Sequence, residues 1–397
     1  MTVTHETHYQ KSLSRIPWAT QTNAKRYQPD MDPMPPFIER AQGCRMWDMD
    51  GKEYIDYRCS LGPIILGYRH PVVDAAVMEQ MRKGVLFSMA SPIELETAEA
   101  ILSCIPWAEQ IRFMKTGNDA CACCLRLARQ LTGRDHIVSI GYHGFHDWFT
   151  TRWPHSGVPP LLQTLVHEAG YGDLDALESI FAQYGSQIAG VIMEPYDWGR
   201  DLHREYLQQV RRLCDRFGSL LIYDEVLTGF RMALGGAAAF YGVIPDLAVY
   251  AKALANGYPV SAFAGTRAAM SALDKTILTT TYAGETLSLA ACKAVMQIMQ
   301  EEPVHAHIYA MGKRLQEGFN HLAREFRVPV EMYGLEPSSG LQVHLDEPKR
   351  THLYNRLMAL FYQHGIFANV RWFISLSHTP EDIDDTLERM GKSLALL

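Results

Sequence analysis

The segment that decides the fold is LLIYDEVLTGFRMALGGAAAFYGVIPDLAVYAKALANG, residues 220–257. It contains two apolar runs, LLIY and LAVYA, and a charged residue follows each run directly: Asp224 the first and Lys252 the second. Apolar runs of roughly four to eight residues that end in polar or turn residues are typical of fully buried strands. We therefore predict buried strands over 220–226 and 247–253, each with a charged side chain at its carboxyl end.

Four more apolar runs flank this segment, and amphipathic patterns such as ACACCLRLARQL separate most of them. Strands that are apolar throughout and alternate with helices indicate a buried, mostly parallel sheet, so the fold class predicted is α/β. The four runs are QIRFMKT (110–116), HIVSIGY (136–142), IAGVIMEP (188–195) and SAFAGT (261–266).

The two ends of the chain have a different character. Residues 1–61 are rich in proline and contain a predicted hairpin around Asp50-Gly51, between CRMWDMD and KEYIDYR. From residue 291 onward helical patterns dominate, with short predicted strands at VPVEMY, GLQVHL and FISLSH. We therefore expect a large domain over 62–290 and a smaller α+β domain over 291–397, which the N-terminal segment 1–61 joins.

Composition narrows the function classes. The chain has 397 residues and a formal net charge of −7, which argues against a nucleic-acid binder because phosphate neutralisation needs basic stripes. The polar N-terminus MTVTHETHYQ lacks the apolar core of a secretory signal, and no apolar run reaches the roughly 20 residues of a membrane helix. We expect a cytoplasmic protein whose eight cysteines are thiols.

Clusters of cysteine and histidine raise the possibility of a metal site. Cys121 and Cys124 recur at helical spacing with apolar neighbours, and Cys123 lies between them, so packing in a buried helix face explains these residues better. His143 and His146 lack a clearly paired second set of ligands, which disfavours zinc. We predict no metal site, and a metal-dependent hydrolase that uses these histidines with Asp147 is a disfavoured alternative.

The residues at the carboxyl ends of the predicted strands are informative, because open parallel sheets bind ligands there. Lys252 can form a Schiff base with an aldehyde, and a buried Asp224 can keep a pyridine nitrogen protonated. The turn Thr116-Gly117-Asn118 opens a helix whose first N–H groups suit a phosphate ester, and Tyr142 could stack on a flat ring. An aldehyde, a pyridine nitrogen, a phosphate and a flat ring together describe pyridoxal phosphate (PLP).

Longer stretches around these residues resemble class III aminotransferases, and within that class they look most like the glutamate-1-semialdehyde aminomutase branch. The resemblance covers nearly the whole chain in the expected order. It implies a PLP-dependent transferase of fold type I, with a mainly parallel seven-stranded sheet, a smaller split α+β domain, and a homodimer. The stretches include FMKTGNDACACCLRLARQLTGRDHIVSIGYHGFHDW, LLIYDEVLTGFR, LAVYAKALANG, TTYAGETLSLAA and PPFIERAQGCRMWDMDGKEYIDY.

The resemblance also implies roles for single residues. Lys252 matches the Schiff-base lysine, and Asp224 matches the partner of the ring nitrogen. Val226 and Tyr142 match the residues on the two faces of the ring, although Val226 could equally be simple core.

The remaining cofactor positions follow in the same way. Gly117 and Asn118, with Thr116 before them, match the phosphate loop, where relatives usually carry Gly-Thr or Gly-Ser. Thr281 matches a threonine that reaches the phosphate of the neighbouring subunit. Glu194 matches a strand-end acid beside the cofactor, and a purely hydrogen-bonding role is its alternative.

The substrate is less well defined by the sequence. Arg26 falls near a substrate-carboxylate arginine of the aminomutase branch, with an ordinary exposed arginine as the alternative. GIFANVRWFISLSHT has no counterpart to the aminomutase glutamate, and Arg371 lies there instead. We predict ping-pong transfer from an amino donor to a small carbonyl acceptor that is anionic or derived from a sugar or polyol. Aminomutase, racemase or epimerase activity and a non-catalytic PLP-fold subunit are the alternatives.

Overall fold

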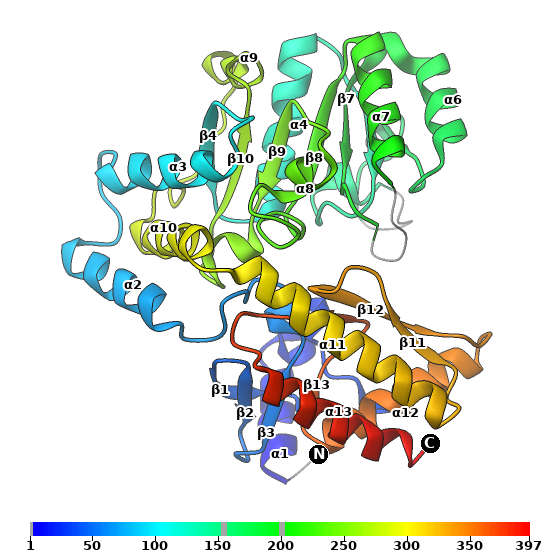
Figure 1. Ribbon diagram of the computed structural model, residues 1–397. Coiled ribbons are helices and arrows are strands. Elements are labelled where there is room, and N and C mark those ends of the chain that lie inside the picture. Colours follow the sequence, from blue (N-terminus) through cyan, green and yellow to red (C-terminus); the bar gives the residue numbers. More distant parts are fainter. Residues whose placement is uncertain (1–2, 152–156, 198–202) are drawn as a thin grey trace. The chain divides into compact units, whose positions relative to one another are not determined.

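The computed structural model describes residues 3–151, 157–197 and 203–397. The chain divides into two compact units. One unit joins the two ends of the sequence, Met1–His70 and Ala306–Leu397, and the other is the continuous segment Pro71–His305. Figure 1 shows the continuous segment as a sheet flanked by helices.

A seven-stranded sheet forms the centre of the unit Pro71–His305. Five neighbouring strands pair in parallel, and β10 pairs antiparallel with the strands on both its sides. The predicted mostly parallel α/β sheet is confirmed, and the sequence missed only the short strand β6. The spatial order is β4 (Gln110–Met114), β10 (Ser261–Gly265), β9 (Leu247–Tyr250), β8 (Leu220–Glu225), β7 (Ile188–Met193), β5 (His136–Ile140) and β6 (Val166–Glu168).

Helix α4 (Gly117–Thr132) shows how the sequence sets the elements around this sheet. It begins with a capping box, in which Thr116 and Asp119 satisfy each other's backbone N–H groups, and it ends at Gly133 with φ +65°. Its buried face includes Cys121, Cys123 and Cys124, as the helical spacing predicts. The other helices of the unit are α2 (Pro71–Lys83), α3 (Pro92–Cys104), α5 (Pro160–Gln163), α6 (Leu174–Tyr184), α7 (His203–Phe217), α8 (Gly236–Tyr241), α9 (Arg267–Met270) and α10 (Thr286–Glu301).

The unit that joins the two chain ends contains two small sheets. The first has the order β1 (Ile38–Gln42), β2 (Arg45–Asp48), β3 (Glu53–Asp56) and β13 (Ile366–Phe367), and its antiparallel β2–β3 pair confirms the predicted hairpin. The second consists of β11 (Val330–Tyr333), β12 (Ser338–Val343) and β14 (Arg371–Phe373). The helices are α1 (Val3–Leu13), α11 (Val304–Glu325), which crosses the boundary of the unit, α12 (Lys349–Gln363) and α13 (Pro380–Leu394).

The prediction of a strand over FISLSH is wrong for most of that segment. Strand β14 ends at Phe373, and a turn follows. In this turn the buried Nδ1 atom of His378 accepts a hydrogen bond of 3.0 Å from the backbone N–H of Ser375. Local bonds between side chains and backbone compete with strand pairing, and here they lead into Thr379, the N-cap of α13.

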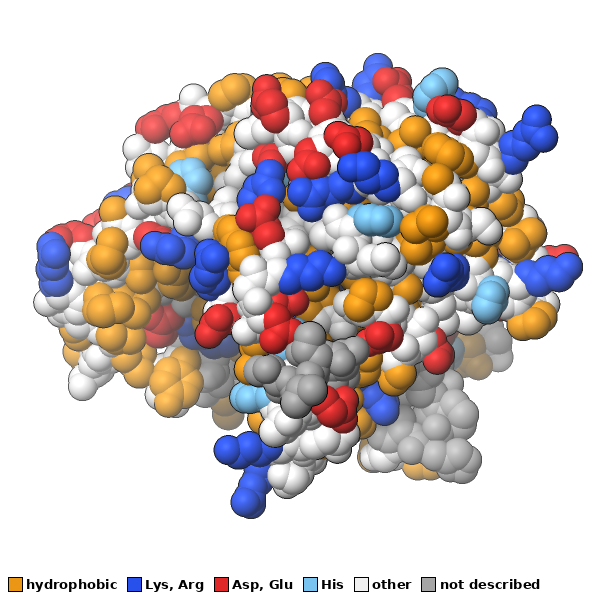
Figure 2. All heavy atoms as spheres, turned by 90° about the horizontal axis from the view of Figure 1, so that it is seen from below, with side chains coloured by type: hydrophobic (Ala, Val, Ile, Leu, Met, Phe, Trp, Pro, Cys, Tyr) orange, Lys and Arg blue, Asp and Glu red, His pale blue; other side chains and the backbone are white. Residues whose placement is uncertain are grey.

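Two surface observations bear on the excluded function classes. Among the described residues, no helix is both long enough and apolar enough to cross a lipid bilayer. On the face shown in Figure 2, acidic and basic side chains lie among one another and do not form a basic stripe.

Candidate functional site

All the predicted cofactor residues except Thr281 come together at the carboxyl ends of the strands, where they line one cavity of about 270 Å³. Strand β8 supplies Asp224, β9 leads to Lys252 and β7 leads to Glu194. This volume is near the lower end for small-molecule sites, roughly 300 Å³. The lining residues are Thr116, Gly117, Asn118, Tyr142, His143, Gly144, Phe145, Glu194, Asp224, Val226, Leu227 and Lys252.

Asp224 is only 4% exposed, and protein donors surround its carboxylate. Its Oδ2 atom lies 2.7 Å from Nδ1 of His143 and accepts a hydrogen bond from Sγ of Cys121 at 3.5 Å. Its Oδ1 atom accepts the backbone N–H of Val226 at 3.0 Å. These donors hold the carboxylate in place, and a buried carboxylate can keep a pyridine nitrogen protonated.

His143 and Cys121 contact Asp224, and the sequence did not reveal these contacts. Spacing assigned Cys121 to core packing and left His143 without partners, whereas the fold brings both to Asp224 within one buried cluster. Nothing in the spacing of residues 121, 143 and 224 signals this contact, because it depends on how α4, the loop after β5 and strand β8 meet.

Glu194 organises the loop that carries Tyr142. Its Oε2 atom accepts the backbone N–H of Tyr142 at 3.0 Å and the hydroxyl of Tyr171 at 3.1 Å. Burial and the nearby charge of Asp224 raise the pKa of Glu194. A Cβ atom on Gly141 would lie 2.7 Å from Glu194 Oε2, so the loop needs glycine there, at φ +106°. These contacts are the hydrogen-bonding role that the sequence left open for Glu194.

Lys252 directly follows β9 and Ala251, and it opens a short 3₁₀ turn, Lys252–Ala255. Its backbone has φ +43°, in the left-handed region that side chains other than glycine rarely adopt. Such a conformation costs on the order of 1–3 kcal/mol and is concentrated at functional sites. Asn256, which ends the turn, is also left-handed, at φ +47°. The chain thus maintains a strained turn at the position of the predicted Schiff-base lysine.

The residues at the start of α4 form a cradle for an anion. The first N–H groups of a helix have no acceptor within the helix, and Gly117 and Asn118 occupy these positions. A Cβ atom on Gly117 would lie 2.5 Å from Cγ2 of Val226, so only glycine leaves this wall of the cavity open. The Oδ1 atom of Asn118 accepts the backbone N–H of His146 at 3.1 Å, which ties the loop after β5 to the helix start.

These residues fit PLP by three independent observations. Buried polar atoms, His143 Nε2 and Asn118 Nδ2, lack a hydrogen-bond partner among the described residues. The glycine at 117 keeps space at a helix N-terminus, where a phosphate binds well. Tyr142, 55% exposed, presents an aromatic side chain at the cavity. Lysine, carboxylate, phosphate cradle and ring platform therefore occur in one cavity.

Three predicted residues lie elsewhere. Thr281 is exposed in the segment before α10 and does not line this cavity. Arg26 is exposed beside the 3₁₀ turn Asn23–Lys25, and Arg371 begins β14. Both arginines belong to the other compact unit, so their roles toward a substrate remain predictions.

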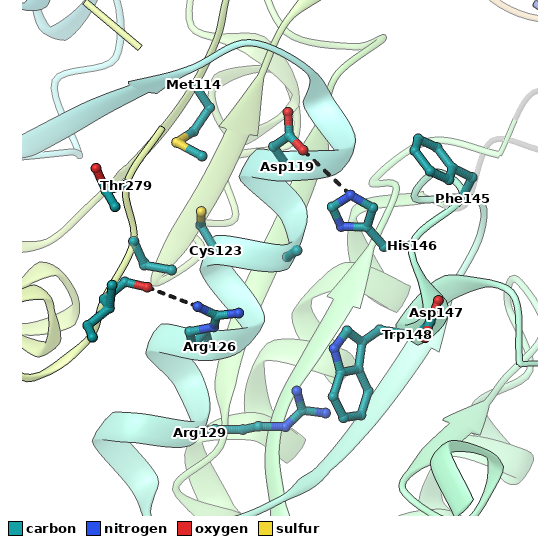
Figure 3. A pocket seen from close by; sticks show the side chains of 13 residues that line it. Met114, Asp119, Cys123, Arg126, Arg129, Phe145, His146, Asp147, Trp148 and Thr279 are labelled. Carbon is teal, nitrogen blue, oxygen red and sulfur yellow. Dashed lines mark hydrogen bonds and ion pairs between the residues drawn. The ribbon is translucent and has the colours of Figure 1, made fainter. Parts of the chain in front are cut away.

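A larger cavity, of about 820 Å³, opens on the outer side of α4 (Figure 3). Its polar contacts are a His146–Asp119 pair at 3.5 Å and a hydrogen bond from Arg126 to the carbonyl oxygen of Ile277 at 2.9 Å. Neither Lys252 nor Asp224 lines it. The volume of a cavity therefore does not identify the site. The smaller cavity is the candidate because Lys252 and Asp224 line it.

Comparison with known proteins agrees with this assignment. The family model for aminotransferase class-III matches residues 26–394. A 3-aminobutyryl-CoA aminotransferase of Cloacimonas acidaminovorans (strain Evry) is 34% identical over 374 residues, which cover 91% of this chain and 89% of that relative.

Solved structures agree as well. The PLP internal aldimine form of FumI from Sphingopyxis sp. MTA144 matches with a TM-score of 0.93 and 28% identity, covering 99% of this chain and 96% of that one. A glutamate-1-semialdehyde aminomutase from Pseudomonas aeruginosa PAO1 matches with a TM-score of 0.85, covering 99% and 94%, but at 21% identity it shows the shared fold alone. The chain belongs to the class-III aminotransferase family and is a PLP-dependent aminotransferase of fold type I.

Proposed function

We propose that this protein moves an amino group from an amino donor to a carbonyl acceptor in two half-reactions, with Lys252 as the cofactor lysine and Asp224 as the partner of the ring nitrogen. The observation that carries the proposal is the placement of these two residues. They lie at the ends of neighbouring parallel strands, β9 and β8, and line the same cavity.

PLP supplies an aldehyde that takes up amino groups and a ring that accepts electrons from the substrate carbon. Asp224 holds a proton on the ring nitrogen, and His143 and Cys121 keep its carboxylate in place. The helix start at Gly117 and Asn118 would hold the phosphate of PLP. Tyr142 and Val226, which line the same cavity, would hold its ring.

Lys252 moves the proton. Its Nζ amine would remove the hydrogen from the carbon that bears the substrate's amino group and deliver it to the former aldehyde carbon of the cofactor, on the other side of the nitrogen, so the same residue acts first as base and then as acid. A lysine amine needs its neutral form for this task. General acid–base transfer of this kind contributes about 10²–10⁴-fold in rate.

We infer that the substrate is a β-amino acyl compound. The relative that is 34% identical is named for 3-aminobutyryl-CoA, whose amine stands β to the thioester carbonyl. Arg371 or Arg26 would then bind an anionic group of the donor or acceptor, as planar guanidinium groups do well. Transfer with release of the product is preferred over the aminomutase reaction, which would return the amino group to the same carbon skeleton.

We also propose a cytoplasmic homodimer. The segment MRKGVLFSMA, residues 81–90, is exposed throughout except for the partly buried Gly84. Met89 is 83% exposed, and Ile277, which lines the cavity of about 820 Å³, is 84% exposed. Exposed apolar groups in such number mark interaction surfaces, and a second copy of the chain would cover them and approach Thr281. Sedimentation of the Met89→Asp and Ile277→Asp double variant should show monomers, and an unchanged dimer would contradict this interface.

The test of the function uses purified protein with PLP and a panel of amino donors that includes 3-aminobutyryl-CoA, β-amino acids, glutamate and alanine. Each donor is added alone, and the visible absorbance of the cofactor is followed. A true donor should bleach the band in a single half-reaction, and a carbonyl acceptor should restore it. Lys252→Ala should abolish both changes.

Two results would contradict the proposal. Bleaching of the Lys252→Ala variant at the wild-type rate would refute the role of the lysine. Conversion of a single substrate to its positional isomer, with no exchange of amino groups between molecules, would establish the aminomutase reaction instead.

A further inference from the structure

Asp224 is a carboxyl group that is only 4% exposed. Its recorded ion pair is with His143, at 2.7 Å between Oδ2 and Nδ1. Hydrogen bonds from His143, from Cys121 and from the backbone N–H of Val226 stabilise the carboxylate. Each donor counts more in such a place than it would at the surface, because a buried charge without donors is strongly unfavourable.

The donors can be counted against the capacity of the carboxylate. A carboxylate offers about four acceptor positions on its two oxygens. His143 and Cys121 use two of them on Oδ2, and the backbone N–H of Val226 uses one on Oδ1. This arrangement leaves about one position for a ligand in the cavity and restricts rotation of the carboxylate plane.

Cys121 is suited to remain a donor. It is 0% exposed, and burial together with the nearby charge of Asp224 raises the pKa of its thiol well above the usual value. The sulfur therefore keeps its proton at neutral pH and can only donate to the carboxylate. Thiols are weak donors that also pack like small apolar groups, so Cys121 serves the core of α4 and the site together.

We propose that Cys121 is a positioning residue of the cofactor site, whose thiol donates to Oδ2 of Asp224 and, with His143, fixes the carboxylate that faces the ring nitrogen of PLP. This inference rests on the proposed role of Asp224. The helical spacing of Cys121 in the sequence predicts only that it packs in the core, and this inference gives it a function as well.

Cys124 provides a matched control. It lies one turn further along the same helix, is also 0% exposed, and shows no hydrogen bond to a carboxylate among the described residues. Replacement of either thiol by valine fills a similar space, but only Cys121→Val removes a donor from Asp224. Cys121→Ser keeps a donor at the same position.

The first measurement is the affinity for PLP, by equilibrium dialysis, together with the melting temperature. Cys121→Val should raise the dissociation constant of PLP roughly three- to tenfold, as expected for the loss of one hydrogen bond from a thiol, which is a weak donor. Cys121→Ser should return the constant to within about twofold of the wild type, since a hydroxyl is the stronger donor. Cys124→Val should leave it unchanged.

The second measurement does not involve the cofactor. The thiols of Cys44, Cys59 and Cys104 also donate hydrogen bonds. The S–H stretching band in the infrared spectrum of the PLP-free protein should therefore contain several shifted components, one of which belongs to Cys121. That component should disappear in Cys121→Val, persist in Cys124→Val and move in Asp224→Asn.

The outcomes separate this inference from the proposed function. If Asp224→Asn loses tight PLP binding while both valine variants bind like the wild type, the role of Asp224 stands and that of Cys121 is refuted. Equal losses in both valine variants would show packing alone and also refute it. Wild-type binding by Asp224→Asn would instead contradict the proposed function.

Discussion

The two sides of strand β8 at its carboxyl end carry adjacent carboxylates with opposite surroundings. Asp224 lines the cavity and accepts bonds from His143, Cys121 and Val226. Glu225 is 0% exposed and caps helix α8, accepting the backbone N–H groups of Ala237 at 2.8 Å and Ala238 at 3.1 Å. Successive side chains of a strand point to opposite faces. Asp224 therefore faces the cavity, whereas Glu225, the next residue, faces helix α8.

Burial raises the pKa of Glu225 to about 7, and the bonds from Ala237, Thr228 and Ala238 oppose that shift. For Asp224 the surroundings consist of donors directed at the charge. The comparison teaches that two neighbouring acids of one motif, IYDEV, can be distinguished by what their oxygens accept rather than by how deeply they are buried.

The largest expected effect tests the Asp224 side. Asp224→Asn should lower kcat/KM by about 10³-fold, within the roughly 10²–10⁴-fold range of single positioned catalytic groups, because the amide no longer favours a protonated ring nitrogen. Its melting temperature should stay close to that of the wild type. Steady-state kinetics and calorimetry check both, and a variant with full activity would remove the distinction between the two acids.

Glu225→Gln should change the pH dependence of the unfolding free energy and leave the turnover number at saturating PLP nearly unchanged. This is the reverse of the pattern expected for Asp224→Asn. Glu225 has a higher pKa in the folded protein than in the unfolded chain, so the stabilisation from its protonated form is complete below about pH 4.5 and is lost as the pH rises through about 7. The wild type should lose on the order of 1–3 kcal/mol of unfolding free energy across this window. Urea titrations of Glu225→Gln should lack that loss, and an identical slope in both proteins would contradict the assignment.

Two glycines extend the comparison to the backbone. A Cβ at 117 would meet Val226 in the cavity wall at 2.5 Å, whereas a Cβ at Gly236 would meet Glu225 Oε1 at 2.7 Å. Gly117→Ala should therefore weaken PLP binding by roughly tenfold with little change in melting temperature. Gly236→Ala should destabilise the fold by about 1–3 kcal/mol and leave PLP affinity alone. Weaker PLP binding in Gly236→Ala, or a destabilised fold in Gly117→Ala, would contradict the assignment of Gly117 to the cofactor cavity and of Gly236 to structural support.

The smallest expected effect concerns Tyr142. Its backbone N–H, not its hydroxyl, makes the recorded bond to Glu194. Tyr142→Phe keeps the ring platform and should change kcat and PLP affinity by less than about twofold, whereas Tyr142→Ala should weaken PLP binding by roughly fivefold through lost stacking. A larger loss in the phenylalanine variant would give the hydroxyl a role that the geometry does not assign.

The sequence predicted the sheet well because most of its strands are apolar runs that end in polar or turn residues. It missed β6, which has three residues, Val166–Glu168, and ends in an exposed glutamate, so it offers no apolar run. It extended a strand into FISLSH because a pattern of apolar residues does not reveal that His378 closes a turn.

The site shows the same division. Strand ends are visible in the sequence, so Asp224, Lys252, Glu194 and the loop at Gly117 could be located. The contact of Cys121 with Asp224 could not, because it joins residues 103 positions apart through the packing of α4 on the sheet. Arg26 and Arg371 remain predictions from the sequence, as does the reach of Thr281 across a subunit boundary.

The pairing of β8 with β9, Asp224 beside Val249 and Glu225 beside Tyr250, has a consequence for how such an enzyme can change. The separation between the acid and the lysine turn is set by main-chain hydrogen bonds that no single side-chain replacement removes. The surrounding loops can therefore vary in length and composition, and so accommodate new substrates, while the reactive pair keeps its spacing. Laboratory evolution toward new amines should accumulate its successful changes outside these two strands.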